Sequence, residues 1–511
     1  MIDAFCDHGI LSKEEILATD GISPSTFQYS ITYQSYIDYF ISIKAINEVP
    51  NCGTAIPSIL KSRVEWNPLR LSAISLFNDV GQMIGENGYW VSDLNSEDIR
   101  LLQYEVLSNT TSEKIKHYLP ELKKRFFSSA TERNEILNDF IFPNLYRKDL
   151  QLAKEFVHNT LIGYKTTFER DLFWSGPDKF SGNEDATLGQ LFRNSKLYPF
   201  NGYDELPLIL AWSLTATDNV HREHARRELT WWGFQNPEGF IKILDLIFFV
   251  GDPQLQEDLS AILMGISSLN IKPGNGQQQL AEWVLTNLFQ KDKIVQVRNS
   301  VVRHCCRAVV ERAYSLGECD LESAKTARPP YQTGQDLLKF DTTGKRGGSG
   351  ERFPIVHDLA WYVIKRSYED LLDSKDGRSA EAKELLRQYE EAYKVKLTPF
   401  EFAMSTAIAF IKSLGWDRPG GPGMTAESHG SVSKLATLEE KYTWLAVHEI
   451  QGYLLDLVPY ESYYKEFDRV LDYNMIIHVP NPAVKGSFEV DEVDSELLED
   501  KWFVPENMLL Q

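Results

Sequence analysis

Helical periodicity dominates the middle of the chain, between Leu206 and Leu316. Apolar residues recur there at steps of three and four, and short breaks with proline, glycine or asparagine separate segments of about 11 to 22 residues. This pattern predicts a series of amphipathic helices, each with one apolar stripe that packs against its neighbours.

The clearest of these segments is Pro253–Leu269. Its apolar stripe comprises Leu255, Leu259, Ile262, Ile266 and Leu269. Asp252 stands directly before it and offers a side-chain cap, and a proline is favourable in the first turn of a helix. We therefore expect a helix over 253–269 that starts after Asp252 and buries one face.

A second segment repeats the same steps. Its stripe comprises Val302, Cys306, Val309, Ala313 and Leu316, and Gly317 follows as a helix-closing residue. Helices recur every 15 to 25 residues or so, and a pair thus spans about 40, the period of HEAT and armadillo repeats. The predicted fold is all-α, a HEAT/armadillo-like helical repeat (α-solenoid) with irregular insertions.

Changes in pattern divide the chain into three predicted regions. Residues 1–170 form an N-terminal helical region, 171–330 hold the HEAT-like repeats, and 331–511 form a C-terminal helical region with Gly/Pro-rich loops. The second boundary is marked by Pro329-Pro330 and the glycine-rich stretch that follows.

The N-terminal region contains one mixed pattern. Ser25–Ile46 first alternates aromatic and polar residues and then settles into helical spacing through Tyr36, Phe40 and Ile43. We expect the later part of this segment to be a helix.

Length and charge narrow the possible functions. A chain of 511 residues exceeds what one core usually organises, and a hydrophobic fraction of 43% is ample for a folded interior. The 53 basic residues face 73 acidic ones, which gives a net charge of −20 and a pI near 5.1. Because this charge repels phosphate backbones, a nucleic-acid partner is not expected.

The location expected from the sequence is the cytoplasm. The first residues carry acids where a secretion signal needs a basic region, and no apolar run reaches the 18 or so residues of a membrane span. The 5 cysteines are few, odd in number and irregularly spaced, as in a reducing compartment. We expect no membrane partner.

Two motifs that could hold a cofactor or a metal are incomplete. The loop around Gly344-Lys345 resembles a phosphate-binding loop, but Lys339 stands where a glycine is needed and Arg346 where Ser or Thr is needed. A flexible surface loop is the simpler interpretation. No cofactor is therefore expected.

The second motif is His448-Glu449, which matches the first two residues of the His-Glu-x-x-His motif of zinc proteases. Position 452 is Gly452 in place of the second histidine ligand, so we interpret His448 and Glu449 as a buried structural polar pair. His221 and His224 lie three apart on one helix face, and charged surface explains them better than a metal site. No metal ligand and no catalytic residue is predicted.

Several segments resemble the C-terminal helical region of large bacterial STAND-type (NACHT-like) P-loop ATPases, the group that includes anti-phage sensors. The matching segments are Ile31–Phe40, Leu210–Leu229, Val250–Gly265, the helix with Arg307 and Glu311, Pro329–Thr333, His357–Ile364 and Glu440–Leu454. Nothing in the chain corresponds to the ATPase core, so ATP hydrolysis is not implied.

The resemblance implies a sensing or scaffolding arm. The predicted function is a non-enzymatic helical-repeat scaffold or sensor that binds a protein partner, a P-loop ATPase or a phage protein, in bacterial antiviral defence. Trp231, Trp232 and Trp416 are the candidate partner-binding residues, because tryptophan often anchors interfaces. Core packing is the alternative for these side chains, and it is favoured slightly for Trp231.

Two other functions remain open. One is a metal-dependent hydrolase whose site forms from dispersed histidines and carboxylates, such as His221, Glu223 and His224. The other is a regulatory protein controlled by proteolytic cleavage in the flexible loop near Gly347.

Overall fold

The structure is a computed structural model of the whole chain. It describes residues 11–16, 26–31, 34–52, 55–57, 60, 66–86, 90, 93–174, 205–217, 219–270, 272–274, 276–290, 297–328, 331, 336–342, 355, 359–365, 372, 379–416 and 438–458. Helices make up most of these residues, so the predicted helical class is confirmed. The chain divides into two compact units, Met1–Leu150 (unit 1) and Gln151–Gln511 (unit 2).

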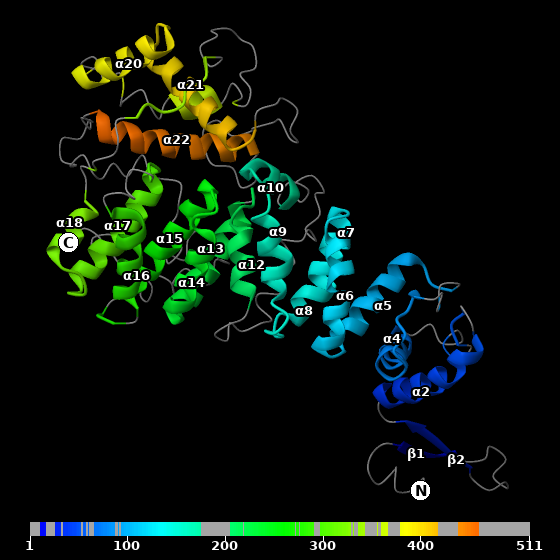
Figure 1. Cartoon of the computed structure of the whole chain (residues 1–511). Coiled ribbons are helices and arrows are strands. Elements are labelled where there is room, and N and C mark those ends of the chain that lie inside the picture. The colour runs from blue at the N-terminus through cyan, green and yellow to red at the C-terminus, as the bar shows by residue number, and fades with distance from the viewer. Residues whose placement is uncertain are drawn as a thin grey trace. The chain divides into compact units, whose positions relative to one another are not determined.

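Unit 1 consists of a hairpin followed by a series of helices (Figure 1). Its elements are β1 (Leu11–Ile16), β2 (Thr26–Ile31), α2 (Gln34–Cys52), α4 (Trp66–Ser75), η1 (Leu76–Val80), α5 (Ser96–Ser108), α6 (Ser112–Phe126), α7 (Ala130–Glu135), η3 (Ile136–Ile141) and α8 (Phe142–Asn144). Here η denotes a π-helical segment. Helix α4 packs against both α2 and α5, and α5 packs against η3.

The hairpin was not part of the predicted all-α architecture. β1 and β2 are antiparallel, with Leu11 opposite Ile31 and Ile16 opposite Thr26. The alternation of aromatic and polar residues that begins at Ser25 is the strand period, and helical spacing begins with α2. Two periodicities thus follow each other within one short segment.

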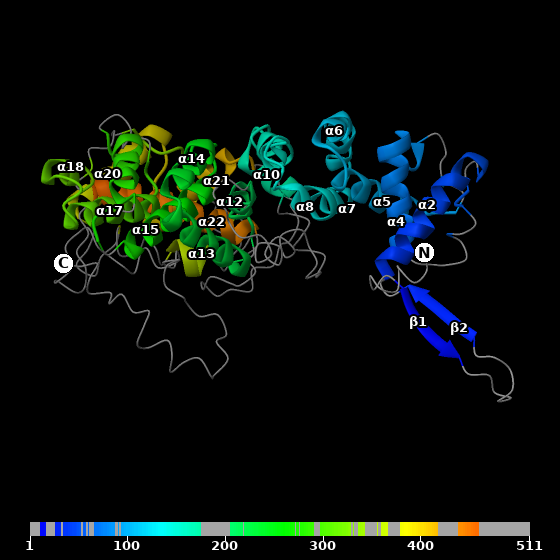
Figure 2. The same cartoon turned by 90° about the horizontal axis from the view of Figure 1, so that it is seen from below.

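Unit 2 contains a longer series of helices (Figures 1 and 2). Its elements are η4 (Ala153–His158), α9 (Asn159–Leu161), α10 (Thr167–Trp174), α12 (Leu206–Ser213), α13 (Asn219–Gln235), α14 (Pro237–Ile247), α15 (Pro253–Leu269), α16 (Gln277–Val284), η5 (Leu285–Phe289), α17 (Ser300–Ser315), α18 (Leu321–Thr326), η7 (Leu359–Lys365), α20 (Ala380–Tyr393), α21 (Pro399–Ser413) and α22 (Leu438–Leu457).

Three helices of unit 2 stand side by side, with α13 packed on α15 and α15 on α17. Helices α14 and α16 contact each other, and they also contact α13 and α17 respectively. Gly233 permits the close packing of α13 on α15, because a Cβ there would lie 2.5 Å from Ile266 Cδ1. We call α13, α15 and α17 the helical row.

Helix α15 has the bounds expected from the sequence. The Asp252 side chain accepts hydrogen bonds from the backbone N–H groups of Gln254 and Leu255, at 3.0 and 3.3 Å. The predicted stripe is buried except for Leu269, which is half-buried. Polar residues outside the stripe, including Glu257 and Asp258, are buried too, so α15 is enclosed on more than one face.

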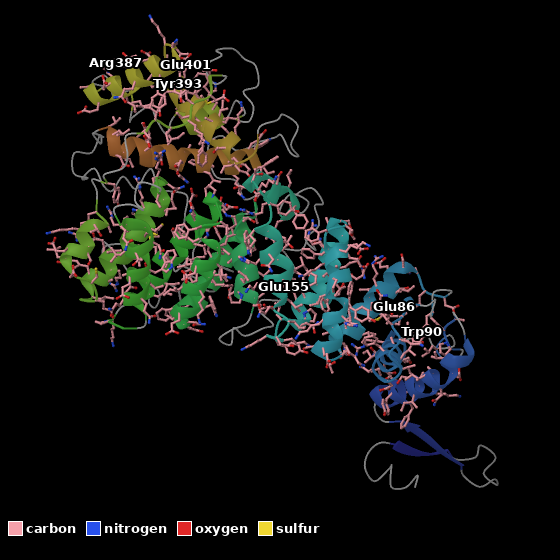
Figure 3. All side chains as sticks on the ribbon, in the orientation of Figure 1. Glu86, Trp90, Glu155, Arg387, Tyr393 and Glu401 are labelled. Carbon is pink, nitrogen blue, oxygen red and sulfur yellow. The ribbon has the colours of Figure 1, made fainter. Side chains whose placement is uncertain are left out.

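The last four elements, η7, α20, α21 and α22, form what we call the C-terminal layer. They share a core whose buried residues all come from Leu338 to Val458. Arg387, labelled in Figure 3, lies on the solvent side of α20 and pairs with Glu384 and Glu391. The C-terminal layer therefore contains apolar packing of its own, distinct from that of the helical row.

Helix α10 packs with the helices that follow it. Unit 2 begins at Gln151, and α10 belongs to it because Arg170 binds Asp252 at the start of α15. Among the described residues, none of the helices combines the length and apolar character needed to cross a bilayer.

Candidate functional site

Helix α22 crosses the ends of the helical row (Figure 1). One side of α22 carries Lys441, His448, Gln451, Gly452 and Asp456, which we call the polar face. Their partners follow the order of the chain: first α10 and the residues after α12, then two helices of the helical row, α15 and α17. The polar face therefore binds successive helices with successive turns.

The first contact centres on Lys441, whose side chain is fully buried. Its Nζ donates to Asp171 Oδ2 in α10 and to the carbonyl oxygen of Thr215, both at 2.7 Å. The hydroxyl of Tyr442 donates to the same Asp171 oxygen at 2.7 Å. Burial raises the pKa of the Asp171 carboxyl, while the Lys441 ammonium acts in the opposite direction. The ammonium thus bridges two segments far apart in sequence.

The second contact joins α22 to α15 and α17. His448 Nδ1 lies 2.9 Å from Glu257 Oε1, and Asn299 Nδ2 donates to the same oxygen at 2.6 Å. Asn299 also caps α17 through its side-chain oxygen. The sequence suggested Glu449 as the partner of His448, whereas the carboxylate that His448 contacts belongs to Glu257.

The third contact lies at the start of α17. Arg303 Nη1 donates to Asp456 Oδ2 at 2.8 Å and to the carbonyl oxygen of Gly452 at 3.1 Å. The Ser300 hydroxyl donates to Gln451 Oε1 at 3.3 Å. The N-terminal parts of α15 and α17 therefore both face α22.

Gly452 is required by the close approach of two backbones. A Cβ at this position would lie 1.5 Å from the carbonyl oxygen of Arg298. No side chain can occupy that space. Packing therefore explains why glycine stands at position 452, where the zinc-protease motif would have a histidine.

Further buried ion pairs lie at the start of α15. Arg170 Nη1 binds Asp252 at 3.1 Å, and Arg226 Nη1 binds Asp258 at 3.2 Å. Arg222 Nε also binds Asp258, at 3.0 Å. Burial lowers the pKa of Arg226, and Asp258 acts in the opposite direction. These pairs hold charges inside the fold at the cost of desolvation.

This arrangement is suited to positioning helices. The named carboxylates and cations are buried, and they bind one another or backbone carbonyls. Both sides of the His448–Glu257 contact lie in segments that carry the resemblance, Glu440–Leu454 and Val250–Gly265. In those two segments, His448 and Glu257 therefore contribute to the packing of α22 on α15.

A different surface of unit 2 exposes two large apolar side chains beside charged ones. Lys242, Asp245, Leu246 and Phe249 are exposed at the spacing of one helix face, which we call the α14 face. Leu246 is 40% exposed and Phe249 is 52% exposed. Trp283 of α16 contacts two residues of this face. Its Nε1 donates to Asp245 Oδ1 at 2.8 Å, and its ring stacks on Phe249.

The sequence contains a signal for the α14 face that periodicity analysis overlooked. The buried stripe of α14 comprises Phe240, Ile243, Leu244 and Ile247. Leu246 and Phe249 are apolar but lie off that stripe. Because they lie off the buried stripe, they are the apolar residues of this segment that a partner could cover.

The predicted tryptophan anchors occupy other environments. Trp232 is 5% exposed and Trp416 is 3% exposed, so neither is available to a partner in this structure. Trp416 stacks on Phe168 of α10, with ring centroids 5.2 Å apart. Trp231 is half-buried and packs edge-on against Phe234. Core packing, the alternative interpretation, describes Trp232 and Trp416.

Two adjacent cysteines of α17, Cys305 and Cys306, are buried, and Cys306 belongs to the apolar stripe expected from the sequence. Cys306 Sγ lies 3.4 Å from the hydroxyl of Ser260, and burial raises the pKa of its thiol to about 12. Cys305 packs in a small core cluster with Ala261 and Val301. Neither thiol is in a reactive environment.

Some predicted features lie outside the described residues. These are the glycine-rich loop at 343–350, with its cleavage point near Gly347, and the side chains of His221 and His224. Within the part of the chain that is described, no group of three or more His, Cys, Asp and Glu side chains could hold a metal ion.

Comparisons of the chain with protein-family models, curated proteins and solved structures find no match in any of the three. The resemblance to STAND-type ATPases therefore remains a prediction from the sequence.

Proposed function

We propose that this chain is a HEAT-like helical scaffold that binds a protein partner through the α14 face. The observation that carries the proposal is the exposure of Leu246 in α14 and of Phe249 in the turn that follows it, beside Lys242 and Asp245. Apolar side chains framed by charged ones are typical of protein interfaces.

The packing of unit 2 supports the repeat part of the proposal. The helical row is built from helices that alternate along the chain with α14 and α16, so each row helix is followed by a second helix. The row helices begin at Asn219, Pro253 and Ser300, at intervals of the order expected for helical repeats. An α-solenoid built this way offers extended surfaces for binding.

The polar face of α22 supports the scaffold part of the proposal. It ties α10, α15 and α17 together through Lys441, His448 and Asp456. A surface held rigid before binding loses less conformational entropy when the partner arrives. The α14 face is therefore presented by a framework whose helices are fixed in position.

The biological setting follows from the sequence resemblance alone. On that basis we propose a cytoplasmic, bacterial, antiviral role in which the partner is a P-loop ATPase or a phage protein. The chain would act in this role by binding and not by catalysis.

A photo-crosslinking amino acid at position 249 tests the proposal in the native host. We expect one dominant crosslinked protein, and we expect its capture to fall at least tenfold in a Leu246→Ala/Phe249→Ala variant, because interface anchors contribute about 2 kcal/mol or more each. Phe127→Ala in unit 1 is the matched control, since Phe127 is 53% exposed. Equal capture by the α14-face variant, with its circular dichroism unchanged, would contradict the proposal.

A further inference from the structure

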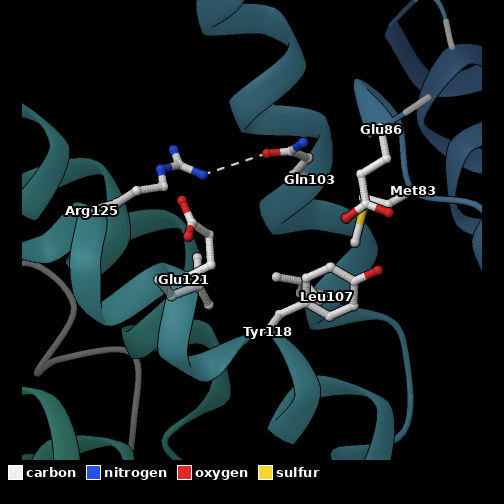
Figure 4. Close-up of a pocket in the computed structure, with 8 residues that line it drawn as sticks. Met83, Glu86, Gln103, Leu107, Tyr118, Glu121 and Arg125 are labelled. Carbon is white, nitrogen blue, oxygen red and sulfur yellow. Dashed lines mark hydrogen bonds between the residues drawn. The ribbon is translucent and has the colours of Figure 1, made fainter. Parts of the chain in front are cut away.

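Unit 1 contains a pocket between α5, α6 and the turn that follows η1 (Figure 4). Its lining residues are Met83, Glu86, Gln103, Leu107, Tyr118, Glu121, Leu122 and Arg125. The pocket belongs to unit 1 alone, so it is independent of the α14 face and of the function proposed for it.

The apolar part of the pocket consists of Met83, Leu107 and Leu122. These side chains are only 2%, 2% and 3% exposed, so they form a fixed apolar lining. The half-buried ring of Tyr118 adds an aromatic wall beside Leu107 (Figure 4). This part of the pocket suits an aliphatic chain.

The only arginine in the lining is already engaged with its neighbours. Arg125 Nε donates to Glu132 at 2.9 Å, and Nη2 donates to the Tyr104 hydroxyl at 2.6 Å. Its Nη1 donates to Gln103 Oε1 at 3.4 Å. Because Glu132 balances its charge and these bonds direct its donors, Arg125 is a poor receptor for an anionic ligand.

Two carboxylates border the same pocket from different elements. Glu86 comes from the turn after η1 and Glu121 from α6, and both residues are exposed. Burial raises the pKa of the Tyr118 hydroxyl, and the nearby negative charge of Glu86 raises it further. With Arg125 balanced by Glu132, the rim of the pocket is negative, and so is the whole chain at −20.

The size of the pocket limits what can enter. Its volume is about 70 Å³. A water needs roughly 10 to 15 Å³ by the same measure, so the pocket has room for about five to seven small heavy atoms. A lysine side chain has about five beyond its Cα, which matches this space.

We propose that this pocket receives a lysine side chain of a partner protein. The methylene chain would lie on Met83, Leu107 and Leu122, and the ammonium would sit between Glu86 and Glu121 beside the ring of Tyr118. An ammonium is attracted by carboxylates and by the face of a tyrosine ring.

Lysine fits this rim better than arginine does. Glu86 and Glu121 approach from separate elements, so they form no single planar receptor for a guanidinium fork. A compact ammonium with three rotatable donors can bond to separated carboxylates, whereas arginine favours one bidentate carboxylate.

The test uses the full chain and two short probes, acetyl-Gly-Lys-Gly-amide and the same peptide with norleucine in place of lysine. The readout is the ¹³C-methyl NMR signal of Met83, assigned by its loss in Met83→Leu. We expect the lysine peptide to shift this signal with an affinity at least about tenfold tighter than that of the norleucine peptide, because charge-assisted hydrogen bonds are lost in the latter.

Variants of the rim complete the test. Glu86→Gln/Glu121→Gln should weaken lysine binding about tenfold or more while leaving the Met83 signal of the free protein in place, and Glu322→Gln on exposed α18 should change nothing. Binding should also weaken at high ionic strength. The proposal is overturned if the lysine peptide causes no shift, if norleucine binds equally well, if an arginine peptide binds more tightly, or if the rim variant retains full affinity.

Discussion

The two sides of α22 make different kinds of contact with the rest of unit 2. Its polar face meets α10 through Lys441 and the helical row through His448 and Asp456, and all three bind charged partners on other helices. Its opposite side contributes Ile450 and Leu454 to the apolar core of the C-terminal layer. Both sides are buried, yet one is held by specific bonds and the other by packing.

In this fold, the contacts that position α22 differ from those that stabilise it. Apolar packing is non-directional and contributes free energy in proportion to the area buried. Buried ion pairs contribute little net free energy after desolvation, but they are costly to break and have one preferred geometry. We infer that the C-terminal layer supplies stability while the polar face sets where α22 lies on the row.

The largest expected effect comes from breaking one buried pair. Asp171→Ala leaves the Lys441 ammonium buried without its carboxylate, which should cost about 4 kcal/mol. Hydrogen exchange of the α22 amides measures this loss. Replacing both charges, in Asp171→Leu/Lys441→Met, should restore much of the protection, because no uncompensated charge remains. A double variant as unstable as the single one would contradict a positional role for the pair.

The apolar side should respond in proportion to volume. Leu454→Ala removes a fully buried side chain from the core and should cost about 3 kcal/mol, with the same exchange measurement. The adjacent Leu455 is 36% exposed and serves as the matched control. Leu455→Ala should stay within about 0.5 kcal/mol of wild type, and equal losses at the two positions would argue against a packed core on one side only.

Gly452→Ala tests the close approach of α22 to α17. In an ordinary helix interior this change would stabilise by about 1 kcal/mol. Here the new Cβ meets the Arg298 carbonyl, so we expect a destabilisation of about 2 kcal/mol from overpacking. Urea denaturation monitored by tryptophan fluorescence measures the free energy of unfolding. A lower value than wild type would support the close approach, and a higher value would contradict it.

The smallest effect expected is a pH dependence. Burial raises the pKa of Glu449 to about 7, with Arg298 and Arg303 lowering it and Glu257 raising it. A raised carboxyl pKa means that the folded state favours the protonated form, so the penalty is absent below about pH 4.5 and grows as pH rises through 7.

Glu449→Gln should therefore match wild type near pH 4.5. The difference between pKa values of 4.5 and 7 corresponds to about 3 kcal/mol, and because Glu449 is only half-buried we expect a gain of about 1 to 2 kcal/mol near pH 8. Urea denaturation across this pH range gives the difference. Exposed Glu381→Gln is the control. A difference that shrinks with rising pH would show that the Glu449 carboxylate is stabilised by Arg298 and Arg303.

The helices of unit 2 could be predicted because their signals are local. Proline and aspartate start α15, Gly317 follows α17 with a left-handed φ of 75°, and steps of three and four mark the buried stripes. The hairpin in unit 1 has a local signal as well, the alternation after Ser25. It was outweighed by the helical spacing that follows in the same segment.

The candidate sites could be predicted only in part. His448 was expected in a buried pair, but periodicity cannot tell that its partner is Glu257, 191 residues away. Exposed and buried tryptophans look alike in sequence, and so Trp232 and Trp416 were assigned to a surface that they do not reach. The pocket in unit 1 combines three elements, and no single motif marks it.

The amino-acid sequence alone was enough to predict the helical class, the bounds of α15 and the apolar stripes of α15 and α17, because each depends on residues within a few turns of one another. Three features could not be predicted from the sequence: that Lys441 binds α10 while His448 and Gly452 contact the helical row, that Leu246 and Phe249 remain outside the core, and that Glu86 and Glu121 border one pocket. These depend on contacts between distant segments, whose geometry is set by the packing of the whole unit.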